Sequence, residues 1–262
     1  MDRFNYRRFT DASKSPCAPP TKCVRPRGSK RSVARWPNFH YHAAVKRLSD
    51  CHLYTFVDTA CLAGRDPLVV ARQLCEGGSD ILQLRAKDKS IDEVHRLAEQ
   101  LLPITAKAGV PLVINDFPAV ARILGAPFAH LGQEDFFDAG HRHVSCFSTG
   151  DRKLGIGLST HSPKQAERAL RAEPDYIAIG PVFATPTKPG RPPATLEYVR
   201  WAAQHVSIPW FAIGGITLAN LDEVLDAGAT RVCVVRAVLD APDIVRACRA
   251  FKERLRSAPR QS

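Results

Sequence analysis

Eight short apolar runs alternate with segments of helical periodicity along most of the chain, and this alternation is the strongest constraint on its fold. Runs rich in Val and Ile that are separated by helices predict parallel strands joined by helical crossovers. We expect strands at residues 53–58, 79–84, 111–114, 127–131, 154–158, 175–179, 208–213 and 230–235. We expect helices at residues 67–76, 90–108, 117–124, 162–172, 193–205, 218–227 and 241–256.

Eight βα repeats within about 205 residues predict a TIM (β/α)8 barrel. A doubly wound sheet is the alternative, but eight regular repeats without a second domain favour a closed sheet. Two helix starts are well marked, by Ser90 and by Ser162 followed by Pro163, because Ser suits an N-cap and Pro the first turn. The fourth helix is poorly marked, within residues 136–153.

The basic charge of the chain is concentrated near its N-terminus. The formal net charge is +11, and residues 1–50 hold 12 basic against 3 acidic side chains. Residues 1–36 have almost no aliphatic side chains, so we expect them to be disordered, whereas residues 37–50 are compatible with a short helix. We therefore divide the chain into a basic N-terminal extension, 1–50, and a catalytic barrel domain, 51–262.

Three interpretations of the extension remain open: an organelle transit peptide, a nucleic-acid-binding arm, or a solvated segment without function. Asp2 and Asp11 count against a transit peptide. The extension lacks interleaved aromatic residues at the density that base stacking needs, which counts against a nucleic-acid partner. No apolar run is long enough to cross a membrane. The eight cysteines form no C-x-x-C pair, which favours a reducing, cytoplasmic location.

Polar residues follow seven of the eight expected strands. Because a barrel gathers the carboxyl ends of its strands at one rim, these residues are candidates for a single site. They are Gln83, Arg85 and Lys87; Asn115 and Asp116; Gln133 to Asp135; Ser159 to His161; Thr185 to Lys188; Gly214 and Gly215; and Val235 and Arg236.

The second strand predicts an anion site. Alternation along a strand puts Gln83, Arg85 and Lys87 on one face, with Leu84 and Ala86 on the other. Two cations that point inward need an anionic ligand, and a diphosphate is a suitable one.

Two further features of the rim match a phosphorylated ligand. Asp116 and Asp135 follow neighbouring strands and together suit Mg²⁺, which prefers a few carboxylates plus phosphate oxygens and water. Gly214 and Gly215, with the backbone amides after the eighth strand, match the usual TIM-barrel phosphate site, where Arg236 adds a positive charge.

Each of these features also has a plainer explanation. Asp116 is a possible cap for the following helix, and the glycine pair is a possible tight turn. His130 and His161 are expected to pack or form hydrogen bonds rather than to catalyse. The plainer explanations weaken together because the features converge on one rim.

Seven segments of the chain, in order, resemble the thiamine phosphate synthase family. They are QLRAK (83–87), IND (114–116), HLGQED (130–135), GLSTHS (157–162), GPVFATPTK (180–188), AIGGI (212–216) and VVRA (234–237). The resemblance covers residues 51–256. It implies a transferase that joins hydroxymethylpyrimidine diphosphate to thiazole phosphate, or to its carboxylated form, and gives thiamine phosphate and pyrophosphate.

The resemblance also implies roles for the rim residues. Mg²⁺ is implied at Asp116 and Asp135, and the catalytic cations are Arg85, Lys87 and Lys188. The pyrimidine diphosphate site takes Gln83, Leu84, Arg85, Ala86, Lys87, Asn115, Ser159 and Lys188, and the thiazole phosphate site takes Thr185, Pro186, Thr187, Gly215, Val235 and Arg236.

The chain departs from the family pattern at several positions. Ala86 replaces an acidic residue but is expected to face away from the ligand, and Arg236 replaces the commoner Ser. Residues 138–153 form a longer fourth crossover, and the extension has no counterpart. The related thiazole tautomerase and a nucleic-acid-binding barrel are the alternative functions. The intact set of cations and carboxylates at the rim favours the synthase.

Overall fold

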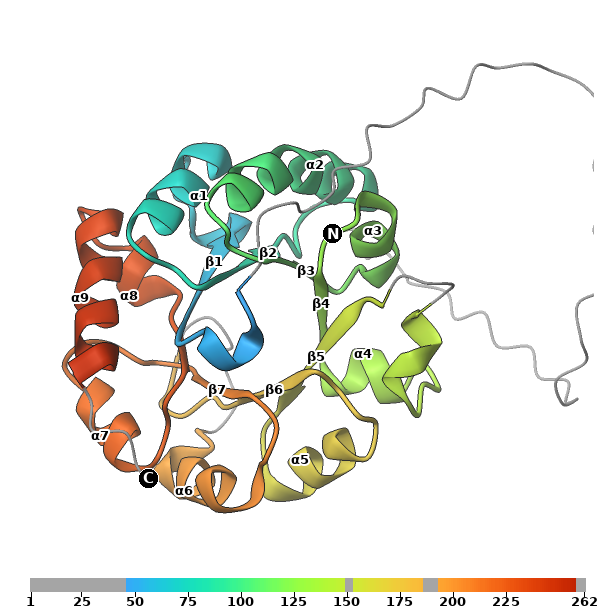
Figure 1. Ribbon diagram of the computed structural model, residues 1–262, viewed down its shortest axis with the longest axis vertical. Coiled ribbons are helices and arrows are strands. Elements are labelled where there is room, and N and C mark those ends of the chain that lie inside the picture. The colour runs from blue at the N-terminus through green and yellow to red at the C-terminus, as the bar shows by residue number, and fades with distance from the viewer. Residues whose placement is uncertain (1–45, 149–152, 186–192, 258–262) are drawn as a thin grey trace, which may run out of the picture. The chain divides into compact units, whose positions relative to one another are not determined.

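Eight parallel strands pair in sequence order and close on themselves, which confirms the predicted (β/α)8 barrel (Figure 1). The computed structural model describes residues 46–148, 153–185 and 193–257, which belong to one compact unit, Asn38–Ser262. The remaining unit, Met1–Pro37, lies outside the described residues, and with it the disorder expected for residues 1–36.

The strands lie where the apolar runs predicted them. Their bounds are β1 (Leu53–Asp58), β2 (Ile81–Arg85), β3 (Leu112–Asn115), β4 (Phe128–Leu131), β5 (Gly155–Thr160), β6 (Tyr176–Ile179), β7 (Trp210–Ile213) and β8 (Val232–Cys233). The strand β8 is shorter than expected because Val235 leaves the extended conformation and becomes the N-cap of the next helix.

Helices follow the strands and surround the barrel (Figure 1). Their bounds are α1 (Pro67–Glu76), α2 (Ile91–Lys107), α3 (Pro118–Leu124), α4 (Gln133–Phe137), α5 (Pro163–Leu170), α6 (Thr195–His205), α7 (Leu221–Asp226), α8 (Arg236–Leu239) and α9 (Ile244–Ser257). The caps are those expected from sequence. Ser90 forms a capping box with Glu93, and the Ser162 hydroxyl accepts from the Gln165 amide.

The fourth crossover has little helix, as its weak sequence signal indicated. The helix α4 has five residues and is followed by a 3-10 helix, Val144–Phe147. Phe136 anchors α4 because its side chain is fully buried in the core. Among the described residues, no helix is long and apolar enough to span a membrane.

Two apolar layers lie on the two sides of the strands. The outer layer packs strands against helices, and a smaller cluster that includes Tyr54, Tyr176 and Phe211 lies on the inner side. The ring of Tyr176 fits because Gly157 has no side chain: a Cβ there would lie 2.1 Å from the Tyr176 Cζ. Glycine on β5 therefore allows an aromatic ring from β6 to fill the barrel.

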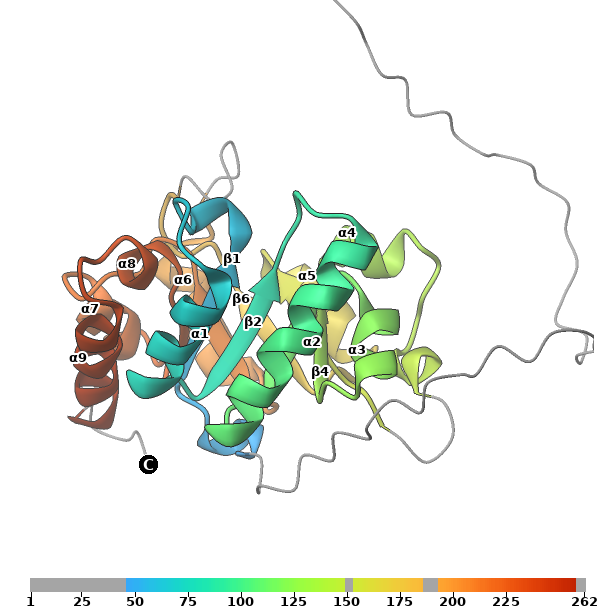
Figure 2. The same ribbon diagram turned by 90° about the horizontal axis from the view of Figure 1, so that it is seen from above.

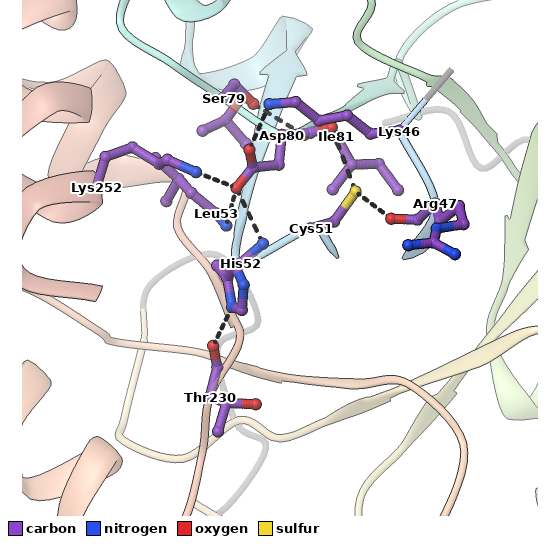
Figure 3. A network of polar contacts seen from close by, with 11 residues as sticks. Lys46, Arg47, Cys51, His52, Leu53, Ser79, Asp80, Ile81, Thr230 and Lys252 are labelled. Carbon is purple, nitrogen blue, oxygen red and sulfur yellow. Dashed lines mark hydrogen bonds and ion pairs between the residues drawn. The ribbon is translucent and has the colours of Figure 1, made fainter. Parts of the chain in front are cut away.

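The arrow of β2 points upward in Figure 2, so its carboxyl end lies at the top of the barrel. A buried ion-pair cluster lies at the opposite end, where β2 begins (Figure 3). Asp80 lies just before β2. Its carboxylate forms an ion pair with the Lys46 Nζ, 2.7 Å from Oδ1, and a second ion pair with Lys252 of α9. The backbone amides of His52 and Leu53 donate to the same carboxylate at 2.9 and 3.0 Å. Burial alone would raise the pKa of Asp80, but these hydrogen bonds outweigh it and lower the pKa.

We predict that Asp80→Ala lowers the free energy of unfolding by about 3 kcal/mol or more, because it leaves Lys252 buried without its counter-charge. The folded-state pKa of Asp80 is lowered, so its contribution is present above the unfolded pKa and is lost as pH falls through the folded pKa. Urea unfolding at neutral and acidic pH measures both effects.

Asp50→Ala is the matched control, since Asp50 lies nearby but is exposed and pairs only with its own neighbours Ser49 and Arg47 among the described contacts. Equal losses in the two variants, or a loss at Asp80 that does not change with pH, would contradict the role given to the cluster.

Candidate active site

A cavity of about 320 Å³ lies at the carboxyl ends of the strands, and every strand contributes to its lining. The sequence predicted a site at this rim. Eight of the residues to which the family resemblance assigns a role line this one cavity: Gln83, Arg85, Asn115, Ser159, Thr185, Gly215, Val235 and Arg236.

The strand β2 places its polar side chains in the cavity and its apolar ones in the core. Gln83 and Arg85 line the cavity, whereas Leu84 and Ala86 are buried in the outer apolar layer. Only the backbone of these last two residues is therefore available to a ligand. The Arg85 guanidinium donates to the Asp58 carboxylate at 2.8 Å, so a buried acid at the end of β1 holds the cation in place.

Lys87 and Asp116 form an ion pair of 3.1 Å beside this cavity rather than within its lining. Asp116 has a φ of +65°, in the left-handed region that Asp tolerates better than most residues. Its amide donates to the His130 carbonyl at 2.9 Å. The helix α3 has no side-chain cap, so Asp116 does not serve as the helix cap.

The two predicted metal ligands line a neighbouring pocket. Asp116, Glu134 and Asp135 all contribute to it. Gly132 leaves room for the acid of α4, because a Cβ at this glycine would lie 2.7 Å from the Asp135 Oδ2. Within the described residues no group of three or more His, Cys, Asp or Glu is placed to hold a metal. Two carboxylates still suit Mg²⁺, whose remaining ligands are commonly phosphate oxygens and water.

At the ends of β7 and β8 the cavity is lined mainly by backbone. Gly214 and Gly215 have φ values of +105° and +66°, and the Asn220 side chain donates to the Gly215 carbonyl at 3.0 Å. Val235 precedes α8, and the Arg236 guanidinium lies 3.3 Å from Asp240. This side offers glycine backbone, the start of a short helix and one cation.

Several residues that line the cavity were not predicted as ligands. Tyr54 and Asp58 come from β1, a mostly apolar strand whose residues are all buried, so its sequence indicates a core strand. His130 was expected to form hydrogen bonds, and it contacts Ser159 through Nε2 at 2.9 Å. His161 donates to the Gly180 carbonyl through Nδ1. The alternation of side chains along β1 was the only signal for Tyr54 and Asp58.

Three predicted residues, Pro186, Thr187 and Lys188, lie outside the described residues. Thr185, the residue before them, lines the cavity.

A sequence model described as thiamine monophosphate synthase matches residues 53–238. The chain belongs to this family. It is 52 % identical over 180 residues to a thiamine-phosphate synthase of Thermus thermophilus, in an alignment that covers 68 % of this chain and 84 % of that one. It is 44 % identical over 214 residues to the thiamine-phosphate synthase of Acidothermus cellulolyticus, covering 80 % of this chain and 98 % of the relative.

Solved structures agree with the sequence comparison. A thiamine phosphate pyrophosphorylase from Pyrococcus furiosus superposes with a TM-score of 0.69 at 26 % identity, over 79 % of this chain and 96 % of that one. The thiamine phosphate pyrophosphorylase of Bacteroides thetaiotaomicron has a TM-score of 0.56 at 18 % identity, over 80 % of this chain and 100 % of that one, which supports the fold alone.

We predict that Gly215→Ala destabilises the protein more than Gly109→Ala does. Both glycines have nearly the same positive φ, +66° and +67°, so both variants carry a similar backbone penalty of about 1–2 kcal/mol. A Cβ at Gly215 would also lie 2.7 Å from the Phe183 Cβ and 2.8 Å from the Ala184 carbonyl, whereas nothing lies within 4 Å at Gly109. We expect this overpacking to add about 1–3 kcal/mol, measured by urea unfolding. Equal losses would show that the rim has room for the methyl group.

Proposed function

We propose that this chain is a transferase that joins hydroxymethylpyrimidine diphosphate to thiazole phosphate, with Mg²⁺, to give thiamine phosphate and pyrophosphate. The observation that carries the proposal is that one cavity is lined by Gln83 and Arg85 at the end of β2 and by Gly215 and Arg236 after β7 and β8. Two phosphorylated rings that must react with each other need adjoining anion sites, and this cavity offers both. Membership of the thiamine monophosphate synthase family supports the same reaction.

The diphosphate side of the proposed site uses cations that already have acidic partners. Arg85 is held by Asp58, and Lys87 is held by Asp116. Because the buried Asp58 carboxylate holds the Arg85 guanidinium in advance, this cation loses little conformational freedom when the anion binds. We assign Lys188, together with Asn115 and Ser159, to the same substrate.

The metal is proposed at Asp116 and Asp135, which line one pocket next to the main cavity. Mg²⁺ bound there supplies positive charge to the departing pyrophosphate. In this structure the Lys87 Nζ forms an ion pair with the Asp116 carboxylate, at 3.1 Å. We expect the lysine to turn toward the diphosphate when the carboxylate binds the metal.

The thiazole phosphate is proposed on the glycine side. We assign this phosphate to the backbone of Gly215 and the Val235–Arg236 amides, and we assign Thr185, Pro186 and Thr187 to the same ligand. Arg236 has only a half-exposed partner, Asp240 at 3.3 Å, so its guanidinium can turn to the ligand. This cation takes the place of the serine hydroxyl that is commoner in the family.

The proposed reaction needs no nucleophilic side chain. The bond between the pyrimidine methylene carbon and the diphosphate oxygen breaks, and pyrophosphate leaves with the bonding electrons. The lone pair of the thiazole nitrogen then forms the new carbon–nitrogen bond to the pyrimidine cation. The role of Arg85, Lys87 and Lys188 is to stabilise the negative charge that develops on the leaving group, and the cavity holds the two rings in contact.

We predict that purified protein with Mg²⁺ and both phosphorylated rings releases one pyrophosphate for each thiamine phosphate formed. Coupled pyrophosphate detection and chromatography of the product measure the two quantities. Omitting either ring should abolish both signals. Isomerisation of the thiazole without pyrophosphate release would instead favour the tautomerase.

We predict that Asp116→Asn weakens divalent-metal binding by at least about tenfold, since even the outer hydrogen-bond partners of metal ligands are worth that much. Titration with Mn²⁺ in the presence of pyrophosphate, followed by electron paramagnetic resonance, measures the affinity without turnover. The matched control is Asp138→Asn, which removes the same charge from an exposed position one helical turn beyond Asp135. Equal affinities in the two variants would exclude Asp116 as a ligand.

A further inference from the structure

A chain of buried polar groups crosses the interior of the barrel. The Gln83 side-chain amide donates to the Tyr54 hydroxyl at 2.6 Å, and the Tyr54 and Tyr176 hydroxyls lie 2.9 Å apart. The Tyr176 hydroxyl lies 3.1 Å from the His130 Nδ1, and the His130 Nε2 lies 2.9 Å from the Ser159 hydroxyl. The chain therefore joins β2 to β5 across the barrel and has a cavity-lining residue at each end.

Packing fixes the middle of this chain. Tyr54 and Tyr176 are almost completely buried. The Tyr176 ring packs edge-on against Phe211, with ring centroids 5.6 Å apart, and stacks on His130 at the same distance. Both tyrosine hydroxyls remain protonated because burial raises their pKa above the usual range. Each therefore has one proton to donate.

The number of protons determines which group donates and which accepts in each hydrogen bond of this network. The Tyr54 oxygen accepts from Gln83, which leaves the Tyr54 proton for the hydroxyl of Tyr176. Tyr176 then directs its own proton to the His130 Nδ1. A neutral imidazole that accepts at one nitrogen donates at the other, so Nε2–H donates to the Ser159 oxygen. The Ser159 proton is then directed to the cavity.

We propose that Tyr176 is a positioning residue: it fixes the Nε2–H tautomer of His130 and thereby makes the Ser159 hydroxyl a donor toward an anionic ligand. A donor suits a diphosphate, whose oxygens only accept. The opposite sense would turn the Ser159 hydroxyl back to His130 and present a lone pair to the anion. Gln83 and Tyr54 set the direction in which the hydrogen bonds donate, and Tyr176 passes this direction on to His130.

The first test does not depend on the proposed function. ¹⁵N resonances of the imidazole rings distinguish a protonated from a bare ring nitrogen, and His130→Gln assigns the signals among the nine histidines. At a pH where the ring is neutral, we expect His130 to be protonated at Nε2 and bare at Nδ1. Protonation at Nδ1 in the wild-type protein would overturn the proposal.

The second test rests on the proposed function. Tyr176→Phe keeps the ring and removes the hydroxyl, and we expect KM for the pyrimidine diphosphate to rise about fivefold, the usual worth of one neutral hydrogen bond. KM for the thiazole phosphate should not change. In a Ser159→Ala background the same substitution should change KM by less than about twofold, because Ser159 is the group through which Tyr176 acts.

The matched control is Tyr198→Phe. Tyr198 is also buried, and its hydroxyl donates a hydrogen bond to the Thr160 Oγ1 at 2.7 Å. It belongs to α6 and is not part of the hydrogen-bond network from Gln83 to Ser159. We expect it to leave both KM values unchanged. Equal effects of Tyr176→Phe with and without Ser159 would overturn the positioning role. Wild-type protein that forms no product but has the expected tautomer would overturn the proposed function alone.

Discussion

The pairing of β8 with β1 is the constraint on which the rest of the molecule depends. Leu53 pairs with Val232 and Tyr54 with Cys233, and these few pairs turn an open sheet into a barrel. Because all strands are parallel, closure brings the end of β8 beside the ends of β1 and β2. Only β1 then separates the end of β8, which carries Arg236, from the end of β2, which carries Arg85. Without closure, Arg85 and Arg236 would lie at distant edges of a sheet.

Local periodicity explains why most of the fold and part of the site were predictable. Alternation along one strand is a local property, so it assigned Gln83 and Arg85 to the inside of the barrel and Leu84 and Ala86 to the outside. Helix starts are equally local, as the Ser90 capping box shows. Ends of elements were less predictable, since β8 stops where Val235 turns into α8.

The rest of the site depends on contacts between distant parts of the chain. Tyr54 and Tyr176 are 122 positions apart, and each taken alone is an aromatic residue in a buried strand. Their contact depends on the absence of a side chain at Gly157, which leaves room for the Tyr176 ring inside the barrel. It also depends on the distance between β1 and β6 in the closed barrel. Likewise, the acid that holds Arg85 comes from another strand, and nothing in the sequence near Asp58 indicates that partner.

The cluster at Asp80 has a consequence for how the barrel resists opening. Lys46 precedes the first strand and Lys252 belongs to the last helix, yet both bind the same carboxylate. One buried carboxylate thus connects the segment before the first strand to the last helix of the barrel. Fraying that begins at either end removes a counter-charge from the same acid and so loosens the other end. The two ends of the barrel therefore share one cooperative unit, although one lysine lies 34 positions before Asp80 and the other 172 positions after it.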